Sequence, residues 1–388
     1  MTDLPLELIF VVLSRLPVKS VLRFRCTCKL WRSLIDSSHF ISFHLRNSLE
    51  TNSNNLLIFR HDSDLHVVDF DTLDTAVEVV HPLMCYGNPL KVLGSCHGLI
   101  CICNVAEDIA LWNLSTHQHK IIALLPVERR PESDTSLFAA RGYGFGYDSF
   151  SDDYKLLRIS CFVDLHTRSF ESLVKIYSLR TNSWKSIQRM PYALCARTMG
   201  VFVGGALHWV VTRKLELDSP DLIIAFDLKH ENFKEVPLPE ELGNENNFQM
   251  KVALLGQSLC MLANYQHTRV DFWVMKEYGH RETWCNLFIL NQSPELGSLK
   301  SVKPLAYSRD GNKVFLELDH KKLYWFDLKN KATSFIQIPR MPSLIDGTIC
   351  VGSLVPPALE SKIDKHQQEL EAKKEREAFL SEGFKLVL

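Results

Sequence analysis

The stretch IYSLRTNSWKSIQRMP (residues 176–191) holds the pattern that decides the fold of most of the chain. The aromatic Tyr177 lies in an apolar run, turn-forming polar residues follow, and a second run ends at Pro191. This order predicts two antiparallel strands joined by a tight turn. Related stretches lie on both sides: VVDFDTLDTAVEVVHP (67–82), LWNLSTHQHKIIALLP (111–126), AFDLKHENFKEVPLP (225–239), WFDLKNKATSFIQIP (325–339) and a weaker copy that starts at FWVM (272–275).

The copies share an aromatic residue that recurs at a similar interval. These aromatics are Phe70, Trp112, Tyr177, Phe226, Trp273 and Phe326. A repeat of roughly fifty residues, with about four strands in each copy, indicates a β-propeller. The copies predict six blades, and the long gap between Trp112 and Tyr177 leaves seven as an alternative. The pair Gly204-Gly205 resembles the kelch diglycine, so we expect a kelch-like propeller and a mainly β fold.

The N-terminal stretch LPLELIFVVLSRLPVKSVLRFRCTCKLWRSLI (residues 4–35) has helical periodicity instead. Between Leu6 and Leu16 the apolar residues cover an arc of about 200°, whereas a surface helix usually shows about 100°. Pro17 ends this helix, a second spans 18–25, and Thr27 is the expected N-cap of a third. Residues 1–46 carry seven Lys/Arg and three Asp/Glu. We therefore expect a small three-helix domain that completes its core against an acidic partner.

The residues of this stretch resemble the F-box, the motif that binds the Skp adaptor of cullin-based SCF ubiquitin ligases. The resemblance implies that the adaptor is contacted by the apolar side chains of Leu4, Pro5, Ile9, Leu13, Leu16, Pro17, Leu22 and Trp31. Two alternatives are a helical hairpin that packs on the next domain and a DNA-reading helix-turn-helix. The wide apolar arc leaves little room for base contacts and disfavours the second alternative.

Three further motifs resemble the plant F-box-associated domain: RGYGFGYDSFSDDYKLLRI (141–159), GSCHGLICI (94–102) and GGALHWV (204–210). The ending FLSEGFKLVL (379–388) resembles plant F-box proteins of the constitutive expresser of pathogenesis-related genes type. This resemblance implies an SCF substrate receptor whose targets are nucleotide-binding leucine-rich-repeat immune receptors. Two alternatives remain: a receptor for another target, such as a ribonuclease, and a propeller scaffold outside any ligase.

These patterns divide the chain into an F-box (1–46), a polar linker (47–55), a propeller (56–357) and a charged tail (358–388). The tail holds six Lys/Arg and seven Asp/Glu, and a solvated helix is expected there. The terminal FKLVL alternates apolar and other residues, so it predicts a strand. We expect this strand to cap an open edge of the propeller, or to serve as a peptide for a partner.

Composition excludes several classes of function. The 388 residues carry a net charge of −1, which disfavours nucleic-acid binding. No stretch approaches the ~20 apolar residues of a membrane span, so no membrane partner is expected. The eleven Cys include no Cys-x-x-Cys, and the pairs Cys26/Cys28 and Cys101/Cys103 do not predict a metal site. Reduced thiols indicate the cytoplasm and the nucleus.

No catalytic residue or cofactor is predicted. The chain lacks G-x-S-x-G and H-E-x-x-H motifs, and His97 and His208 are expected to be structural. Gly142, Gly144 and Gly146 lie between strands and do not form a phosphate loop. A propeller enzyme stays a third alternative. No substrate-binding residue can be named, and the loops to test first are Val127 to Ala140, Lys214 to Asp221, Glu240 to Gln249 and Lys276 to Glu282.

Overall fold

The N-terminal domain consists of four α-helices. The computed structural model describes residues 5–83, 89–122, 137–164, 166–195, 199–216, 221–242 and 248–358. The helices are α1 (Leu6–Ser14), α2 (Val18–Arg25), α3 (Lys29–Ile35) and α4 (Ser38–Glu50). The prediction of three helices is therefore wrong, because Ser37 starts a fourth. The Ser37 side chain accepts a hydrogen bond from the Phe40 amide, as an N-cap does.

Two of the predicted boundaries shift. Helix α4 runs through residues 47–50, which were expected in the linker, and the first strand begins at Asn55. Helix α3 is capped by Cys28, whose sulfur accepts from the Trp31 amide, and not by Thr27. The Thr27 hydroxyl donates instead to the Phe24 carbonyl, 2.8 Å away. None of the helices in the described part of the chain is long and apolar enough to cross a membrane.

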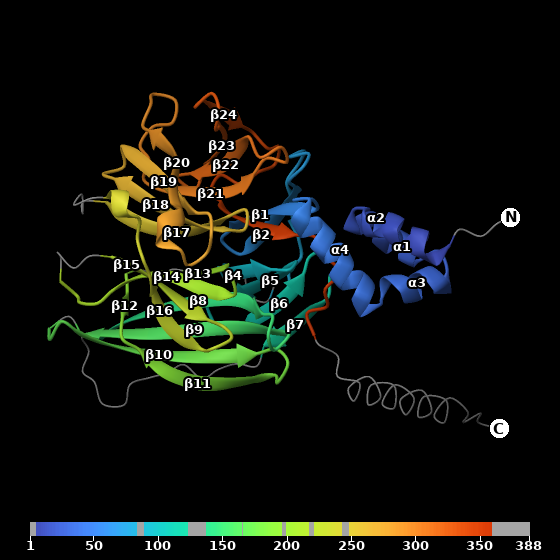
Figure 1. Ribbon diagram of the computed structural model, residues 1–388, viewed down its shortest axis with the longest axis horizontal. Helices are drawn as coiled ribbons and strands as arrows, with labels where there is room; N and C mark the ends of the chain where they lie inside the picture. The colour runs from blue at the N-terminus through green and yellow to red at the C-terminus, as the bar shows by residue number, and fades with distance from the viewer. Residues whose placement is uncertain are drawn as a thin grey trace, which may run out of the picture. The chain divides into compact units, whose positions relative to one another are not determined.

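Antiparallel four-stranded sheets make up much of the rest of the chain (Figure 1). The first contains β25 (Asp346–Val351), β1 (Asn55–His61), β2 (Asp64–Asp69) and β3 (Val77–Val79). The second contains β4 (Lys91–Cys96), β5 (Leu99–Cys103), β6 (Ile109–Asn113) and β7 (His119–Ile122). The third contains β17 (Gln249–Leu255), β18 (Ser258–Tyr265), β19 (Arg269–Met275) and β20 (Trp284–Asn291). The fourth contains β21 (Val302–Tyr307), β22 (Lys313–Leu318), β23 (Lys322–Asp327) and β24 (Thr333–Ile336).

The remaining strands form one nine-stranded sheet. They are β8 (Leu137–Asp148), β9 (Asp153–Asp164), β10 (Ser169–Ser178), β11 (Ser183–Met190), β12 (Ala193–Leu194), β13 (Met199–Val203), β14 (Ala206–Thr212), β15 (Leu222–Asp227) and β16 (Asn232–Val236). The described residues thus show a β-propeller with four separate four-stranded blades, and the prediction of six separate blades, or seven, is wrong. Parallel pairing of β13 with β8, Gly200 opposite Gly144, joins the strands into the nine-stranded sheet.

Glycine permits this close approach of β8 and β13. A Cβ atom on Gly144 would lie 2.7 Å from the Trp209 ring, and one on Gly200 would lie 2.4 Å from it. A Cβ on Gly146 would meet Phe202 at 2.4 Å. Because these glycines lie within β8 and β13, they make room for aromatic side chains. Gly142, Gly144 and Gly146 all lie within β8, between strands as predicted.

The repeated aromatics lie in, or directly after, the strand that neighbours an edge strand of its sheet. They are Phe70 after β2, Trp112 in β6, Tyr177 in β10, Phe226 in β15, Trp273 in β19 and Phe326 in β23. The polar residue near each aromatic often starts the turn, as predicted. The Asp327 carboxylate, for example, accepts from the amides of Lys329 and Asn330 at 2.9 and 2.8 Å.

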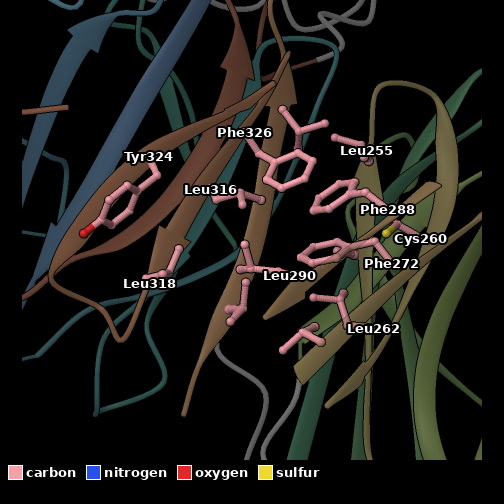
Figure 2. Packing of buried hydrophobic residues seen from close by; sticks show 14 of the residues in the cluster. Leu255, Cys260, Leu262, Phe272, Phe288, Leu290, Leu316, Leu318, Tyr324 and Phe326 are labelled. Carbon is pink, nitrogen blue, oxygen red and sulfur yellow. The ribbon is translucent and has the colours of Figure 1, made fainter. Parts of the chain in front are cut away.

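Apolar clusters between neighbouring sheets form the core. In one of them Phe272 of β19, Phe288 of β20 and Phe326 of β23 stack, with successive ring centroids 4.1 Å apart (Figure 2). The stack crosses from one four-stranded sheet to the next. In the described part of the chain no strand pairing joins these two sheets, so the hydrophobic contact holds the blades together.

The last described strand closes the propeller. Strand β25 pairs with β1 in antiparallel register, from Asn55 opposite Val351 to Arg60 opposite Asp346 (Figure 1). One sheet thus contains the first and the last propeller strands of the described chain. The predicted tail helix and terminal strand lie outside the described residues.

Candidate functional site

The exposed face of α1 is the candidate site. Leu8, Val11 and Val12 lie on one side of the helix and are 53%, 40% and 55% exposed. Leu6, at the start of the helix, is 45% exposed, and Leu30 on α3 is 54% exposed. Large apolar side chains are normally buried when a domain can cover them, so a row of them on one short helix indicates an interaction surface.

The opposite face of α1 is buried against α4. Phe10 contacts Phe40 and Phe43, with ring centroids 5.3 and 5.2 Å apart. The ring of His44, itself fully buried, lies 2.9 Å from the Leu16 carbonyl oxygen through Nε2. Burial lowers the pKa of His44, so the ring stays neutral at physiological pH. Helix α4 therefore decides which side of α1 is left for a partner.

The predicted adaptor-contacting residues divide into three groups. Pro5 and Pro17 are exposed, and they precede α1 and α2, where their missing N–H groups are not needed. Ile9, Leu16, Leu22 and Trp31 are half-buried and pack against the F-box core. Leu4 lies outside the described residues.

Leu13 is buried, unlike the other predicted contact residues that the structure describes. Its side chain is only 2% exposed and belongs to the core with Val18, Val21, Ile35 and Phe40. It supports the helices from inside and does not offer a surface to an adaptor. Conversely, five exposed apolar residues are not among the predicted contacts: Leu6, Leu8, Val11, Val12 and Leu30. The wide apolar arc was the signal for Leu6, Leu8 and Val12, but α4 was needed to show which part of it faces inward.

A basic rim accompanies this apolar face, as predicted. Arg15, Lys19 and Arg23 are exposed on α1 and α2, or in the turn between them. Arg25 is instead neutralised, because its guanidinium donates to both carboxylate oxygens of Asp36 at 2.5 and 3.0 Å. That pair raises the pKa of Arg25. The surface that α1 and α2 leave free is thus apolar with positive charge at its border, which suits an acidic partner.

The helical domain and the propeller share part of their cores. Leu354, which follows β25, is buried among Leu13, Val18 and Phe40 of the helices. Ile41 and Leu45 of α4 pack in turn against a cluster of the propeller. The Gly352 amide also donates to the Asn54 carbonyl at 2.6 Å. The helical domain is therefore held on the propeller by side chains and not only by a linker.

The segment after β25 is anchored to the propeller by a buried amide. The Asn113 side chain donates to the carbonyls of Ser353 and Val355 at 3.1 and 2.8 Å. The Ser353 hydroxyl donates to the His97 carbonyl at 2.8 Å. Gly98 is required beside it, because it has a φ of +83° and an added Cβ would lie 2.1 Å from the Ser353 oxygen.

Both histidines expected to be structural have hydrogen-bonding partners, and His97 Nδ1 lies 3.3 Å from the Tyr154 hydroxyl. His208 Nδ1 lies 3.0 Å from the Val201 carbonyl, and its Nε2 lies 2.8 Å from the Tyr278 hydroxyl. Burial lowers the pKa of His97 and of His208 to about 4, which keeps both rings neutral. The structural role predicted for these residues agrees with these contacts. Among the described residues, no three His, Cys, Asp or Glu side chains gather as metal ligands.

The loops suggested for substrate contact are only partly described. Residues 127–136, 217–220 and 243–247 of these loops lie outside the described residues. Lys276 to Glu282 is described in full. This loop is held by Tyr278, which covers the turn at Gly204 and contacts His208.

Comparison with known families identifies the class of protein. The F-box domain matches residues 1–43, and the F-box-associated β-propeller domain matches residues 54–345. The chain therefore belongs to the F-box proteins with an F-box-associated β-propeller, as the resemblance of its motifs predicted.

The particular relatives come from Arabidopsis thaliana. The chain is 37% identical to F-box protein CPR1 over the full length of both proteins. It is 31% identical to F-box/kelch-repeat protein At3g23880, over 81% of this chain and 85% of that protein. The similarity to CPR1 confirms the kinship expected from the terminal motif.

Proposed function

We propose that this protein is the substrate-recognition subunit of an SCF-type (Skp–cullin–F-box) ubiquitin ligase. The exposed apolar face of α1 carries the proposal. Each large apolar side chain that an adaptor buries contributes roughly 1.5–3 kcal/mol. Association costs about 4–15 kcal/mol, so several such residues are needed. Leu8, Val11, Val12 and Leu30 together supply the apolar side chains needed to offset that cost. The positive charges of Arg15 and Lys19 suit an acidic adaptor.

In this role the chain is not an enzyme. The ubiquitin-conjugating enzyme held by the cullin performs the chemistry, and the F-box protein supplies proximity. Holding a substrate lysine near the charged thioester makes the encounter effectively unimolecular. The shared core around Leu354 supports this role, because a receptor fixed to its adaptor-binding domain keeps the substrate at a constant distance.

The substrate class proposed is an intracellular immune receptor with nucleotide-binding and leucine-rich-repeat domains. Its support is the likeness of the whole chain to the constitutive-expresser type of plant F-box protein. The alternatives are another target, such as a ribonuclease, and a scaffold that binds the adaptor without a cullin. We place the protein in the cytoplasm and the nucleus, with neither nucleic acid nor a membrane as a partner.

The test is co-purification with a Skp adaptor. Leu8→Asp with Val12→Asp should abolish binding, because two charges would enter an apolar interface while the core stays intact. Val77→Asp with Val80→Asp is the matched control, since these valines are 58% and 79% exposed on the propeller. Retained adaptor binding in the α1 variant would defeat the proposal.

Leu16→Ala with Pro17→Ala is a less direct test of the same surface. Leu16 packs against the F-box core, so its truncation would also destabilise the helices. Ubiquitination of a bound protein in a reconstituted assembly then separates a ligase from a scaffold. A complex that contains adaptor and cullin but transfers no ubiquitin would favour the scaffold.

A further inference from the structure

Strand β20 is an unusually open edge of the propeller. It is the outermost strand of its sheet and pairs with β19 alone among the described strands. It has eight residues, as does the outermost strand β11, whereas β3, β7 and β24 have three or four. Long edges are usually protected by charge, because their free N–H and C=O groups can pair with another chain.

The two long edge strands differ in this protection. Strand β11 carries Lys185 and Arg189, which pair with Glu231 and Glu171 at 2.7 Å each. Strand β20, with the sequence WCNLFILN, carries no charged residue, and its Ile289 is 41% exposed. The sequence of β20 therefore leaves its edge suited to strand addition.

A groove runs beside this edge. It has a volume of about 580 Å³ and lies between β20 and the neighbouring blade, at Phe326, Lys331 and Thr333. Phe288, Phe326 and Leu296 form its floor and are 2%, 3% and 5% exposed, and Leu287 and Ile289 of β20 are its more exposed apolar residues. Alternate side chains of a strand added to β20 would point toward this apolar lining.

The groove lining carries positive charge and no negative charge. Lys331 is the only charged residue in its lining. It is exposed and forms no ion pair with another described residue. The other polar residues of the lining are neutral, namely Asn286, Asn291, Ser293 and Thr333. A bound peptide with a carboxylate could therefore pair with Lys331, and no acidic residue of the lining would repel it.

We propose that β20 and its groove bind an extended peptide segment of a partner protein, with alternating apolar residues and an acidic residue placed at Lys331. The segment adds to β20 as a further strand. The inference rests on the proposed receptor role, in that the segment would belong to the substrate. It assigns recognition to backbone pairing on the side of the propeller, with an apolar pocket and one cation for specificity.

The test uses a phage-displayed library of random ten-residue peptides, selected against the full chain. Enriched peptides are expected to alternate apolar and polar residues and to contain Asp or Glu. A synthetic peptide of the enriched sequence should bind Lys331→Glu about tenfold more weakly, the loss expected for one charge-assisted hydrogen bond. Exchanging its acidic residue for Lys should restore binding to that variant.

Two further variants test the edge itself. Ile289→Lys should abolish peptide binding, because it places on β20 the kind of charge that protects β11. Ser186→Lys, on the exposed face of β11, is the matched control and should bind the peptide as the unaltered chain does.

Three results would overturn the inference. They are a library without enrichment, enriched peptides that bind Ile289→Lys and Lys331→Glu unchanged, and a dimer of this chain that Ile289→Lys converts to monomer. The last result would assign the edge to self-association. Adaptor co-purification is measured on the same preparations, so failure of peptide binding is distinguished from failure of the receptor role.

Discussion

Helix α1 and strand β5 are both strongly apolar, yet only one of them is covered by its own chain. Every residue of β5 is buried, whereas α1 leaves Leu8, Val11 and Val12 exposed. Strand β5 lies between β4 and β6 in a sheet that packs against its neighbours, while α1 is covered on one side only, by the core that it shares with the other helices. The same residue types thus stabilise the fold in the propeller and serve an interface in the F-box.

The largest difference between the two regions should appear in stability. Ile100→Ala in β5 should lower the free energy of unfolding by about 2–5 kcal/mol, because it leaves a cavity in a closed core. Leu8→Ala should change it by less than about 0.5 kcal/mol, since the side chain is already in water. Denaturant unfolding of both variants measures the contrast. Equal losses would show that α1 is covered in solution.

A smaller effect is expected where the two regions meet. Leu354 is 7% exposed in the F-box core, so Leu354→Ala should cost about 2–3 kcal/mol, near the lower limit for such truncations. Hydrogen exchange should show the loss in α1 and α2 before it appears in the propeller strands. Leu344→Ala is the control, because that leucine is 49% exposed. Unchanged exchange in α1 would mean that the F-box core does not need the propeller.

The smallest effect should come from His320, whose partner Glu317 also accepts a hydrogen bond from the Gly347 amide of the closing strand β25 at 2.6 Å. His320 Nδ1 lies 2.9 Å from the Glu317 carboxylate, which raises the pKa of the histidine. Stability from the charged ring is present below the histidine's ordinary pKa, near 6.5, and is lost as pH rises through the raised value. The ring is half exposed, so the gain should stay below about 1 kcal/mol.

The pH dependence itself is the measurement. Between pH 6 and 8 the unaltered chain should lose stability relative to His320→Gln, which lacks the titrating ring. His119→Gln on the exposed part of β7 should follow the unaltered chain. Parallel curves of stability against pH for His320→Gln and the unaltered chain would show that the His320–Glu317 pair does not stabilise the closure of the propeller.

The repeat could be read from the sequence because its determinants are local. An aromatic residue in the strand before an edge strand and an Asp or Asn at the following turn lie within a few positions of each other, as at Phe326 and Asp327. The joining of β8 and β13 was missed, because it depends on Trp209 crossing Gly144 and Gly200 from another strand. That contact is visible only in three dimensions.

The same limit applies to the candidate site. The apolar excess of α1 was evident from residues 6–16, and the basic rim was evident from residues 15–32. The identity of the outward residues depended on Phe40 and Phe43 of α4, a helix that the sequence reasoning did not include. Leu13 was therefore assigned to the surface although it lies in the core. Leu354, more than three hundred positions away, completes that core and left no local signal.

The pairing of β25 with β1 has a consequence for biosynthesis. The ribosome makes residues 55–61 early, but their partner at 346–351 emerges only after nearly the whole propeller has been translated. At about 5–20 residues per second, β1 waits roughly 15–60 s with one side unsatisfied. A transcript truncated before codon 346 would yield a nascent product that never acquires this partner, and such a product should be a substrate for chaperones and proteases.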